Sequence, residues 1–368
     1  MARHLNVIGG KPSPARATLA LEVPDEFAAD GLPPLVDDLG RRYSYLRLSV
    51  TDRCDFACVY CMPLGGEDDH AVRPELLTFE EAARVVSVFA QLGIDRVRFT
   101  GGEPLVRRDV VHMVELVQRR TGIDNLVMTT NASRLGELAA PLAQAGLRGV
   151  NISLDSLDAG RFRELTRGGE LTRVLAGVHA ALDAGLEVKL NIVALGGLND
   201  AEAPQLVDWA WDLGITPRFI ELMPLGEASK LPAERFVSHQ QLIERLGSRV
   251  LRDAPEAALK GRSIQGQGPA RYLAAGDGSG RKVGFITAVS DEFCDSCNRV
   301  RVTARGDFRA CLASRTAVSL RDAVRAGKSD RELAWLIHRA LGSKLAGHFF
   351  DRSDVDEHRQ VGMSLVGG

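Results

Sequence analysis

The chain has 368 residues, of which 45% are hydrophobic and 26% are charged, and its formal net charge is −2. This composition is typical of a globular protein with a sizeable core, and the weak net charge argues against nucleic acid or a membrane surface as a partner. No apolar run reaches the ~18 residues of a spanning helix, and no signal-peptide pattern opens the chain. We therefore expect a cytoplasmic protein that meets any anionic ligand with local arginines and lysines.

Residues 1–40 contain five prolines among scattered polar residues and show no sustained hydrophobic period. We interpret them as a loosely ordered N-terminal extension without identifiable chemistry. From Tyr45 to Thr51 apolar and polar residues alternate, which predicts a strand with Arg47 on its polar face.

A cysteine triplet follows this strand directly. Cys54, Cys58 and Cys61 have the spacing C-x3-C-x2-C, so their thiolates can face one centre and hold zinc, copper(I) or an iron–sulfur cluster. A closed zinc site needs four ligands, whereas three cysteines on a four-iron cluster leave one iron open. The nearest further ligand is His70, nine residues past Cys61, so we favour the open iron over a zinc knuckle or unrelated buried thiols.

An alternation of strands and helices follows. A helix over 79–92 begins with a capping box of Thr78 and Glu81, and a strand over 96–100 leads into Gly101-Gly102-Glu103-Pro104. Four further strands are predicted at 125–130, 149–154, 187–193 and 216–222, separated by helices at 109–119, 135–145, 171–184 and 202–213. Six β/α units predict an α/β fold with a parallel sheet covered by helices. Six are too few for a closed eight-stranded barrel, so an open partial barrel and a doubly wound sheet both remain.

Polar residues gather at the predicted carboxyl ends of these strands, where ligands bind in both architectures. The glycine pair at 101–102 would let the backbone approach a ligand closely. We therefore predict a site there, built from Thr51 and the cysteine loop, residues 101–104, Thr129 to Asn131, Ser153 with Asp155, Asn191, and Glu221 to Pro224.

The cysteine triplet with Tyr60 before its third cysteine, joined to the GGEP turn, resembles the radical S-adenosylmethionine (SAM) enzymes. The resemblance implies a partial (β/α)6 barrel and a [4Fe-4S] cluster on Cys54, Cys58 and Cys61. Its open iron binds SAM, and one electron releases a 5′-deoxyadenosyl radical. The positions that match SAM contacts are Tyr60, Gly102, Ser153 and Met223.

A second cysteine triplet lies beyond the α/β region. Residues 230–290 read as a helix followed by irregular, glycine-containing segments. Cys294, Cys297 and Cys311 then have the spacing C-x2-C-x13-C around a strand predicted over 299–303. Three ligands again favour a cluster with one open iron. The alternative is a zinc ribbon completed by Asp291, Asp295 or Asn298.

Cations are predicted on several strands. Arg299 and Arg301 share one face of their strand, as do Arg96 and Arg98 of theirs, and Lys189 adds a cation to another. Guanidinium groups suit phosphates, although a solvated surface also shows paired arginines. Convergence of several such residues on one strand-end face favours a polyanionic substrate.

The chain resembles more closely the radical SAM branch that cyclises GTP in molybdenum cofactor biosynthesis. The resemblance runs from Leu46 to the C-terminus through TDRC, CMP, RFTGGEP, NISLDS, ELMP, CNRVRVTARG and the terminal Gly367-Gly368. It implies hydrogen abstraction at C3′ of GTP, attack on C8, and the product (8S)-3′,8-cyclo-7,8-dihydroguanosine 5′-triphosphate. It also implies a second [4Fe-4S] cluster on Cys294, Cys297 and Cys311, whose open iron anchors the guanine.

The same resemblance assigns the remaining roles. The implied GTP contacts are Arg47, Arg98, Thr129, Lys189, Arg299, Val300 through its backbone, and Arg301, and the residues implied in catalysis are Arg299, Arg301, Gly367 and Gly368. Met363, Leu365 and Val366 would anchor the tail, whose glycines would reach the cavity, although a frayed terminus is the ordinary alternative. Implied partners are a reduced flavodoxin or ferredoxin and the downstream cyclic pyranopterin monophosphate synthase, and a homodimer is compatible.

We divide the chain into the extension (1–40), the barrel core (41–228) and a C-terminal region with the auxiliary cluster and the substrate-side tail (229–368). The long extension departs from the family pattern, so its role stays open. Two alternative functions remain. A radical SAM peptide maturase usually carries more cysteines in its tail than the three found here, and a two-zinc scaffold would be no enzyme.

Overall fold

The computed structural model describes residues 23–27, 31–64, 70–251, 268–314, 316–348, 350 and 363. Its strands are β1 (Tyr45–Ser49), β2 (Arg96–Thr100), β3 (Asn125–Thr130), β4 (Leu147–Ser153), β5 (Glu187–Val193), β6 (Thr216–Ile220), β7 (Arg271–Ala274), β8 (Lys282–Ile286), β9 (Arg299–Val302), β10 (Asp307–Arg309) and β11 (Val318–Ser319). Its α-helices are α1 (Phe79–Gln91), α2 (Val110–Thr121), α3 (Leu135–Gln144), α4 (Ala159–Thr166), α5 (Leu171–Asp183), α6 (Ala203–Asp212), α7 (His239–Leu246), α9 (Leu320–Arg325) and α10 (Asp330–Leu341).

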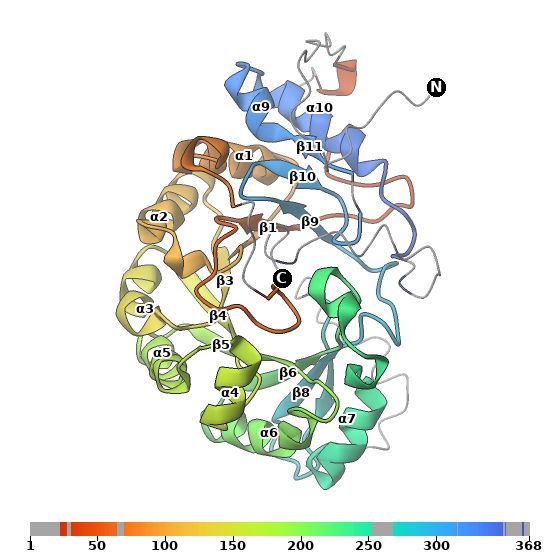
Figure 1. The fold of residues 1–368 in the computed structure, drawn as a ribbon. Coiled ribbons are helices and arrows are strands. Elements are labelled where there is room, and N and C mark those ends of the chain that lie inside the picture. Colours follow the sequence, from red (N-terminus) through yellow and green to blue (C-terminus); the bar gives the residue numbers. More distant parts are fainter. Residues whose placement is uncertain are drawn as a thin grey trace.

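The strands form one curved sheet in the order β11-β10-β9-β1-β2-β3-β4-β5-β6-β8-β7. The eight neighbours from β9 to β8 run parallel, and α1, α2, α3, α5 and α6 cover the outer face (Figure 1). Strands β1 to β6 follow chain order without the reversal that a doubly wound sheet has. The partial barrel is therefore confirmed. No pairing among the described strands closes the sheet between β7 and β11.

Local sequence signals account for the barrel core. Strands β2, β3 and β5 begin and end where predicted. The capping box of α1 is confirmed, since the Thr78 side chain accepts from the Glu81 amide and the Glu81 carboxylate accepts from the Thr78 amide. The helix then buries an apolar stripe that includes Val85, Val86 and Phe89 against the sheet.

The prediction for residues 230–290 was wrong in part. Two short strands, β7 and β8, lie there, and β8 pairs in parallel with β6 at the edge of the barrel. Neither strand has a long alternating pattern. Their pairing partners fix them as strands, which a local sequence pattern does not reveal.

Part of the segment before β1 is packed, although we expected residues 1–40 to be loosely ordered. Residues 23–27 and 31–40 are described and contain buried side chains, whereas residues 1–22 and 28–30 lie outside the described residues. The Leu35 side chain is fully buried, its amide donates to the Leu92 carbonyl, and its carbonyl accepts from the Tyr43 amide, both at 2.9 Å. Phe27 is also buried and contacts the rings of Trp335 and His338 on α10. Because of its prolines, this segment shows no hydrophobic period in the sequence. Its extended chain nevertheless packs on α1 and α10.

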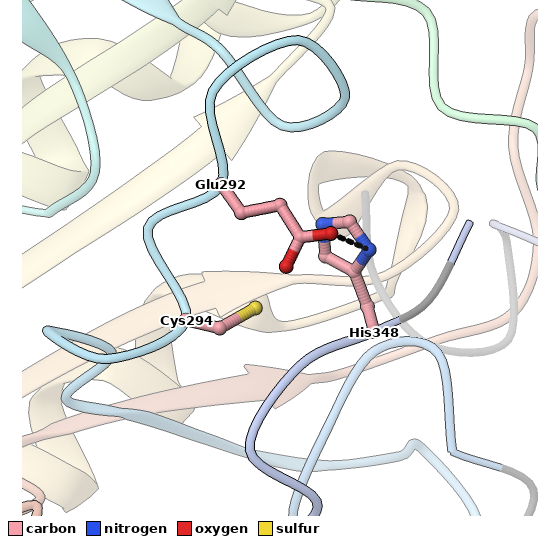
Figure 2. Close-up of side chains that lie close together, drawn as sticks. All are labelled: Glu292, Cys294 and His348. Atoms are coloured by element: carbon pink, nitrogen blue, oxygen red, sulfur yellow. Dashed lines mark ion pairs between the residues drawn. The ribbon is translucent and has the colours of Figure 1, made fainter. Parts of the chain in front are cut away.

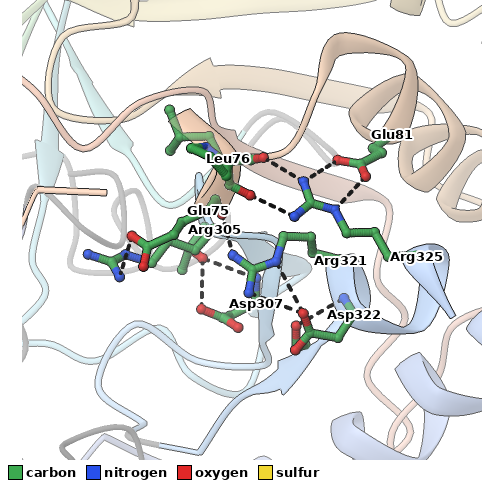
Figure 3. Close-up of polar contacts among 11 residues, drawn as sticks. Glu75, Leu76, Glu81, Arg305, Asp307, Arg321, Asp322 and Arg325 are labelled. Carbon is green, nitrogen blue, oxygen red and sulfur yellow. Dashed lines mark hydrogen bonds and ion pairs between the residues drawn. The ribbon is translucent and has the colours of Figure 1, made fainter. Parts of the chain in front are cut away.

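Arginines tie the C-terminal region to the segment before α1 (Figure 3). Arg325 of α9 pairs with both oxygens of Glu81, at 2.7 and 3.0 Å, and donates to the carbonyl of Leu76. Arg321 donates to the Glu75 carbonyl. Thus α9 is held against the start of α1. Within the described part of the chain, no helix is long and apolar enough to cross a membrane.

We predict that Phe27→Ala destabilises the protein by about 3–5 kcal/mol, because it leaves a cavity between the extension and α10. Chemical denaturation of the full chain measures this loss. Val36→Ala is the control: Val36 is 36% exposed, so its removal should change the stability by less than about 0.5 kcal/mol. A loss of stability in Phe27→Ala as small as that in Val36→Ala would show that the segment does not stabilise the fold.

Candidate active site

The first cysteine loop follows β1 at its carboxyl end. Cys54, Cys58 and Cys61 are all half-buried. The amides of Ala57 and Val59 donate to carbonyls near the end of α4, at 3.1 and 2.9 Å. Helix α4 was not predicted, yet it is the element that holds this loop over the barrel.

The thiols of this loop are poorly placed to ionise without a metal. Burial raises the pKa of Cys58, and burial together with the nearby Glu103 carboxylate raises the pKa of Cys54. A bound cation would supply the missing charge. The loop therefore suits a metal centre better than a reactive free thiolate.

The GGEP turn after β2 is locked to the cysteine loop. The Gly102 amide donates to the Thr51 carbonyl at 2.9 Å, and the Glu103 amide donates to the Arg53 carbonyl at 2.8 Å. A β-carbon at Gly102 would lie 2.3 Å from the Arg53 carbonyl oxygen. We assigned the glycines to close approach of a ligand. In the structure they also allow close approach of the protein's own backbone.

Glu103 fixes the next strand end. Its carboxylate accepts from the Thr130 hydroxyl at 2.7 Å, the Asn131 amide at 2.6 Å and the Leu105 amide at 2.9 Å. Burial nevertheless raises its pKa to about 7. Glu103 thus joins the ends of β2 and β3 through hydrogen bonds.

A first cavity of about 180 Å³ opens at these strand ends. It is lined by the three N-terminal cysteines and by all four predicted SAM contacts, Tyr60, Gly102, Ser153 and Met223. The Tyr60 hydroxyl donates to Asp155 at 2.6 Å, and the Val193 amide donates to the same carboxylate at 2.7 Å. Burial raises the pKa of Asp155 to about 6. Asp155 therefore positions Tyr60 beside the cysteine loop.

A second cavity of about 170 Å³ adjoins the first. It is lined by Cys294, Cys297, Cys311, Arg47, Arg98, Arg299, Arg301, Arg218, Tyr45 and Lys344, among others. Both cavities share Asn191, Ile220, Met223 and Met363. The two cavities, each lined by one cysteine triplet, therefore adjoin along these shared residues.

Strand register explains the cluster of arginines. Arg47 of β1 pairs with Arg98 of β2 on one side and with Arg301 of β9 on the other. Burial, followed by repulsion from Arg301, lowers the pKa of Arg47, and burial with repulsion from Arg299 lowers that of Arg301 to about 10. Buried like charges are costly, so this lining is suited to a polyanion.

The Tyr45 hydroxyl partly offsets the positive charge of these arginines. Burial alone would raise its pKa, but Arg98, Arg47 and Arg96 outweigh burial and lower the pKa to about 8. Arg98 Nε donates to the Tyr45 hydroxyl, and Arg96 lies 5.0 Å from the ring centroid. The phenol is thus an acceptor inside the cation cluster.

The other described residues predicted to contact GTP are Thr129, Lys189 and Val300, and none of them lines the second cavity. Thr129 lines the first cavity and accepts from Arg98 at 3.2 Å. Of the described predicted contacts, Lys189 and Val300 line neither cavity. Burial and repulsion from Arg218 lower the pKa of Lys189, and Val300 is fully buried. Gly367 and Gly368 lie outside the described residues.

Sequence reasoning missed two basic residues of the second cavity. Arg218 lies opposite Asn191 in the register of β5 and β6 and donates to its side chain at 2.6 Å, so strand periodicity could have found it. Lys344 follows α10, far along the chain from the cysteines. No sequence signal placed it here.

The second cysteine triplet has a more cationic surrounding than the first. Lys344 Nζ lies 3.4 Å from Cys297 Sγ, and Arg299 Nη2 lies 3.7 Å from it. Burial would raise the pKa of Cys297, but Arg299 and Lys344 lower it to about 6. Arg41 donates to the Cys294 carbonyl at 2.9 Å, while Asp37 holds its Nε at 2.6 Å. Arg299 and Lys344 therefore stabilise a thiolate at Cys297.

The spacing of the thiols bears on the kind of metal centre. Neither described triplet has all three sulfurs within 4.8 Å of one another, whereas two ligands of one tetrahedral zinc, with bonds of about 2.3 Å, lie about 3.8 Å apart. Asp291 is paired with Arg271, Asn298 donates to Ser44 and Asp295 is exposed. The residues therefore fit multi-iron clusters better than single zinc ions.

The fold and the cysteine loop define a radical SAM enzyme, and residues 48–210 match the radical SAM superfamily. Residues 215–350 match a second family, Molybdenum Cofactor Synthesis C. The chain is 44% identical over 346 residues to the GTP 3′,8-cyclase of Rhodopseudomonas palustris strain TIE-1, covering 91% of this chain and 96% of the relative. The GTP 3′,8-cyclase of Caulobacter vibrioides is 43% identical over 343 residues, covering 91% and 94%. The chain belongs to the GTP 3′,8-cyclase family.

Among solved structures, the chain is similar to Streptococcus suis SuiB bound to S-adenosylmethionine. The TM-score is 0.56, and the match covers 82% of this chain and 68% of that one. At 15% identity this likeness concerns the fold alone. The much higher identity to cyclases argues against the peptide-maturase alternative.

We predict that Gly102→Ala lowers SAM cleavage by about 100-fold, because the new β-carbon must displace the backbone beside the cysteines. Iron content and the rate of deoxyadenosine formation after anaerobic reconstitution measure this effect. Gly136→Ala is the control, since a β-carbon there meets nothing within 4 Å. A Gly102→Ala protein with wild-type cleavage would disprove the locked contact.

Proposed function

We propose that the two adjoining cavities form one active site, in which SAM cleavage in the first cavity starts cyclisation of GTP in the second. The chain is then a lyase that converts GTP to (8S)-3′,8-cyclo-7,8-dihydroguanosine 5′-triphosphate, the first step of molybdenum cofactor biosynthesis. The observation that carries this proposal is that two adjoining cavities share lining residues, one cavity holding the first cysteine triplet and the predicted SAM contacts, the other the second triplet and the arginines.

In the first cavity, Cys54, Cys58 and Cys61 hold a [4Fe-4S] cluster. When bound, the cluster supplies the electron that breaks a sulfur–carbon bond of SAM. Tyr60, Gly102, Ser153 and Met223, which line this cavity, would bind and orient SAM.

In the second cavity, the arginines bind the triphosphate. Arg47, Arg98 and Arg301 form one row across β9, β1 and β2, and a polyanion relieves their mutual repulsion. Arg218 of β6 lines the same cavity apart from this row. Thr129 contributes through its bond with Arg98. Lys189 and the Val300 backbone belong to the proposed contacts by resemblance alone, since neither residue lines the cavity. Binding of phosphate oxygens by these groups holds the ribose of GTP still during hydrogen transfer.

The guanine end of GTP lies against the second triplet in this proposal. Cys294, Cys297 and Cys311 would hold the second [4Fe-4S] cluster, which would offer an open iron to the base. Arg299 and Lys344 orient Cys297, and Arg41 holds the loop that carries Cys294. Gly367 and Gly368 are proposed to reach into the cavity with Met363, which lines both halves, as their neighbouring anchor.

The partners of the reaction follow from its chemistry. The first cluster needs a one-electron donor, for which we propose a reduced flavodoxin or ferredoxin. The product would pass to cyclic pyranopterin monophosphate synthase. A cytoplasmic location, where thiols stay reduced, and a homodimer without nucleic-acid or membrane contacts are parts of the same proposal.

We predict that the two triplets have separable roles. Cys58→Ser should abolish reductive cleavage of SAM, because the radical cannot be started. Cys297→Ser should retain part of the cleavage but form no cyclised GTP. Product analysis after incubation with SAM, GTP and dithionite tests this, with circular dichroism as the folding control. Equal loss of SAM cleavage in both folded variants would contradict the division.

We predict that Arg299→Ala and Arg301→Ala each weaken GTP binding by ~30-fold or more, the equivalent of at least about 2 kcal/mol for a buried charged contact. SAM cleavage should be largely retained. Titration calorimetry with GTP measures the affinity. Arg148→Ala is the matched control, because Arg148 is an exposed arginine on a barrel strand. Unchanged affinity in both test variants would place the phosphates elsewhere.

A further inference from the structure

Tyr45 lies among the arginines of the second cavity and has no role in the proposed reaction. Its side chain is 3% exposed and lines the cavity together with Arg47 and Arg98. Arg98 Nε donates to its hydroxyl, and the guanidinium groups of Arg96 and Arg98 lie 5.0 and 5.7 Å from its ring centroid. A buried phenol thus contacts the guanidinium of Arg98, which is proposed to bind the triphosphate.

Positive charge surrounds Tyr45 from its own strand and from neighbouring strands. The charged groups around it are Arg47 of β1, Arg96 and Arg98 of β2, Arg299 of β9 and Arg218 of β6, and a second phenol, Tyr272 of β7, shares Arg218 with it. Burial would raise the pKa of Tyr45, but Arg98, Arg47 and Arg96 outweigh burial and lower the pKa to about 8. The phenol therefore ionises in mildly alkaline solution.

Tyr45 is one of three groups that fix the guanidinium of Arg98. Arg98 Nη1 donates to the carbonyl of Met128 at 3.3 Å and to the hydroxyl of Thr129 at 3.2 Å, while Nε donates to Tyr45. A guanidinium binds phosphate through a planar fork, so its orientation decides which oxygens it reaches. The neutral phenol supplies this fixed orientation without adding charge.

We propose that Tyr45 is a positioning residue of the triphosphate site: its neutral phenol orients Arg98 toward the phosphates of GTP, whereas its phenolate competes with them for the surrounding arginines. This inference rests on the proposed function, because it takes GTP as the anion of the second cavity. The chemical step is a proton exchange with solvent. The phenol of the empty cavity loses its proton at alkaline pH and recovers it when GTP binds, and no other bond changes.

The direction of the pH dependence follows from linkage. A phenolate and a triphosphate are both anions, so a bound triphosphate raises the pKa of Tyr45 above its value of about 8 in the empty cavity. GTP binding therefore takes up a proton wherever the empty site has already lost it. The affinity for GTP is complete below the pKa of the empty site and is lost as the pH rises above it.

Titration calorimetry with GTP tests this on the full chain, reconstituted anaerobically with its clusters. The affinity of the unsubstituted protein, divided by that of Tyr45→Phe at the same pH, should fall about tenfold between about pH 7 and about pH 9. Tyr43→Phe is the matched control, because burial raises the pKa of Tyr43 and its hydroxyl donates to Asp37 at 2.7 Å. This control should keep the full pH dependence. Identical pH profiles of the unsubstituted protein and Tyr45→Phe would overturn the proposal.

Other groups of the cavity titrate as well, and the matched comparison removes their effect. His348 lines the cavity and is paired with Glu292 at 3.4 Å beside Cys294 (Figure 2). The guanine base of GTP titrates too. All of these groups are the same in the proteins compared, so the ratio of affinities at one pH reports the ionisation of Tyr45.

A double-mutant cycle tests the positioning role. Near neutral pH, Tyr45→Phe should weaken GTP binding by about fivefold, through the loss of one hydrogen bond. In an Arg98→Ala background the same substitution should have no further effect, because Tyr45 acts through Arg98. Additive effects of the two substitutions would overturn this role.

Iron analysis and SAM cleavage show whether Tyr45→Phe keeps its clusters. If it does not, 3,5-difluorotyrosine at position 45 takes its place, since it keeps nearly the same shape and its phenol is more acidic. The loss of GTP affinity should then move to lower pH, and an unmoved profile would overturn the proposal. An unsubstituted protein that binds no GTP at any pH would refute the proposed function, whereas binding with a profile independent of Tyr45 refutes only this inference.

Discussion

The parallel pairing of β9 with β1 is the interaction on which the site depends. It joins a strand of the C-terminal region to the first strand of the barrel and sets Arg301 beside Arg47. The same pairing fixes the distance between the two cysteine triplets, because the first follows β1 and the second flanks β9. A slip by one residue would turn Arg299 and Arg301 away from the cavity and bring Val300 and Val302 into it.

The buried arginines show how a binding requirement opposes stability. Arg98, Arg96 and Arg218 are each at most 6% exposed, and their charges lie close together in a low-dielectric space. Part of the cost is offset by the Tyr45 hydroxyl and by Asn191, which accept from Arg98 and Arg218. The remaining repulsion is available to a polyanionic ligand as binding energy. The protein without its ligand is therefore less stable than its core alone would make it.

Sequence patterns predicted the alternation of strands and helices because its signals are local, whereas the choice of a partial barrel came from the family resemblance. Each of these signals spans only a few residues. Examples are the Thr78 cap, the strand from Arg96 to Thr100 and the cysteine spacing. By contrast, Lys344 reaches the site from the segment after α10, which only tertiary packing brings there. The short strands β7 and β8 were missed for the same reason, since pairing with β6 defines β8 and pairing with β8 defines β7. Long-range contacts leave no period in the sequence.

The contacts of Arg41 show which part of the site is completed late during synthesis of the chain. Arg41 stands near the start of the chain, yet its guanidinium donates to the carbonyls of Cys294, Leu345 and Ala346. These contacts form only after Cys294, Leu345 and Ala346 have been synthesised. By then strands β1 to β6 and helix α4, to which the first cysteine loop is hydrogen-bonded, have already been made. The surroundings of the second cysteine triplet are therefore completed later in synthesis than those of the first.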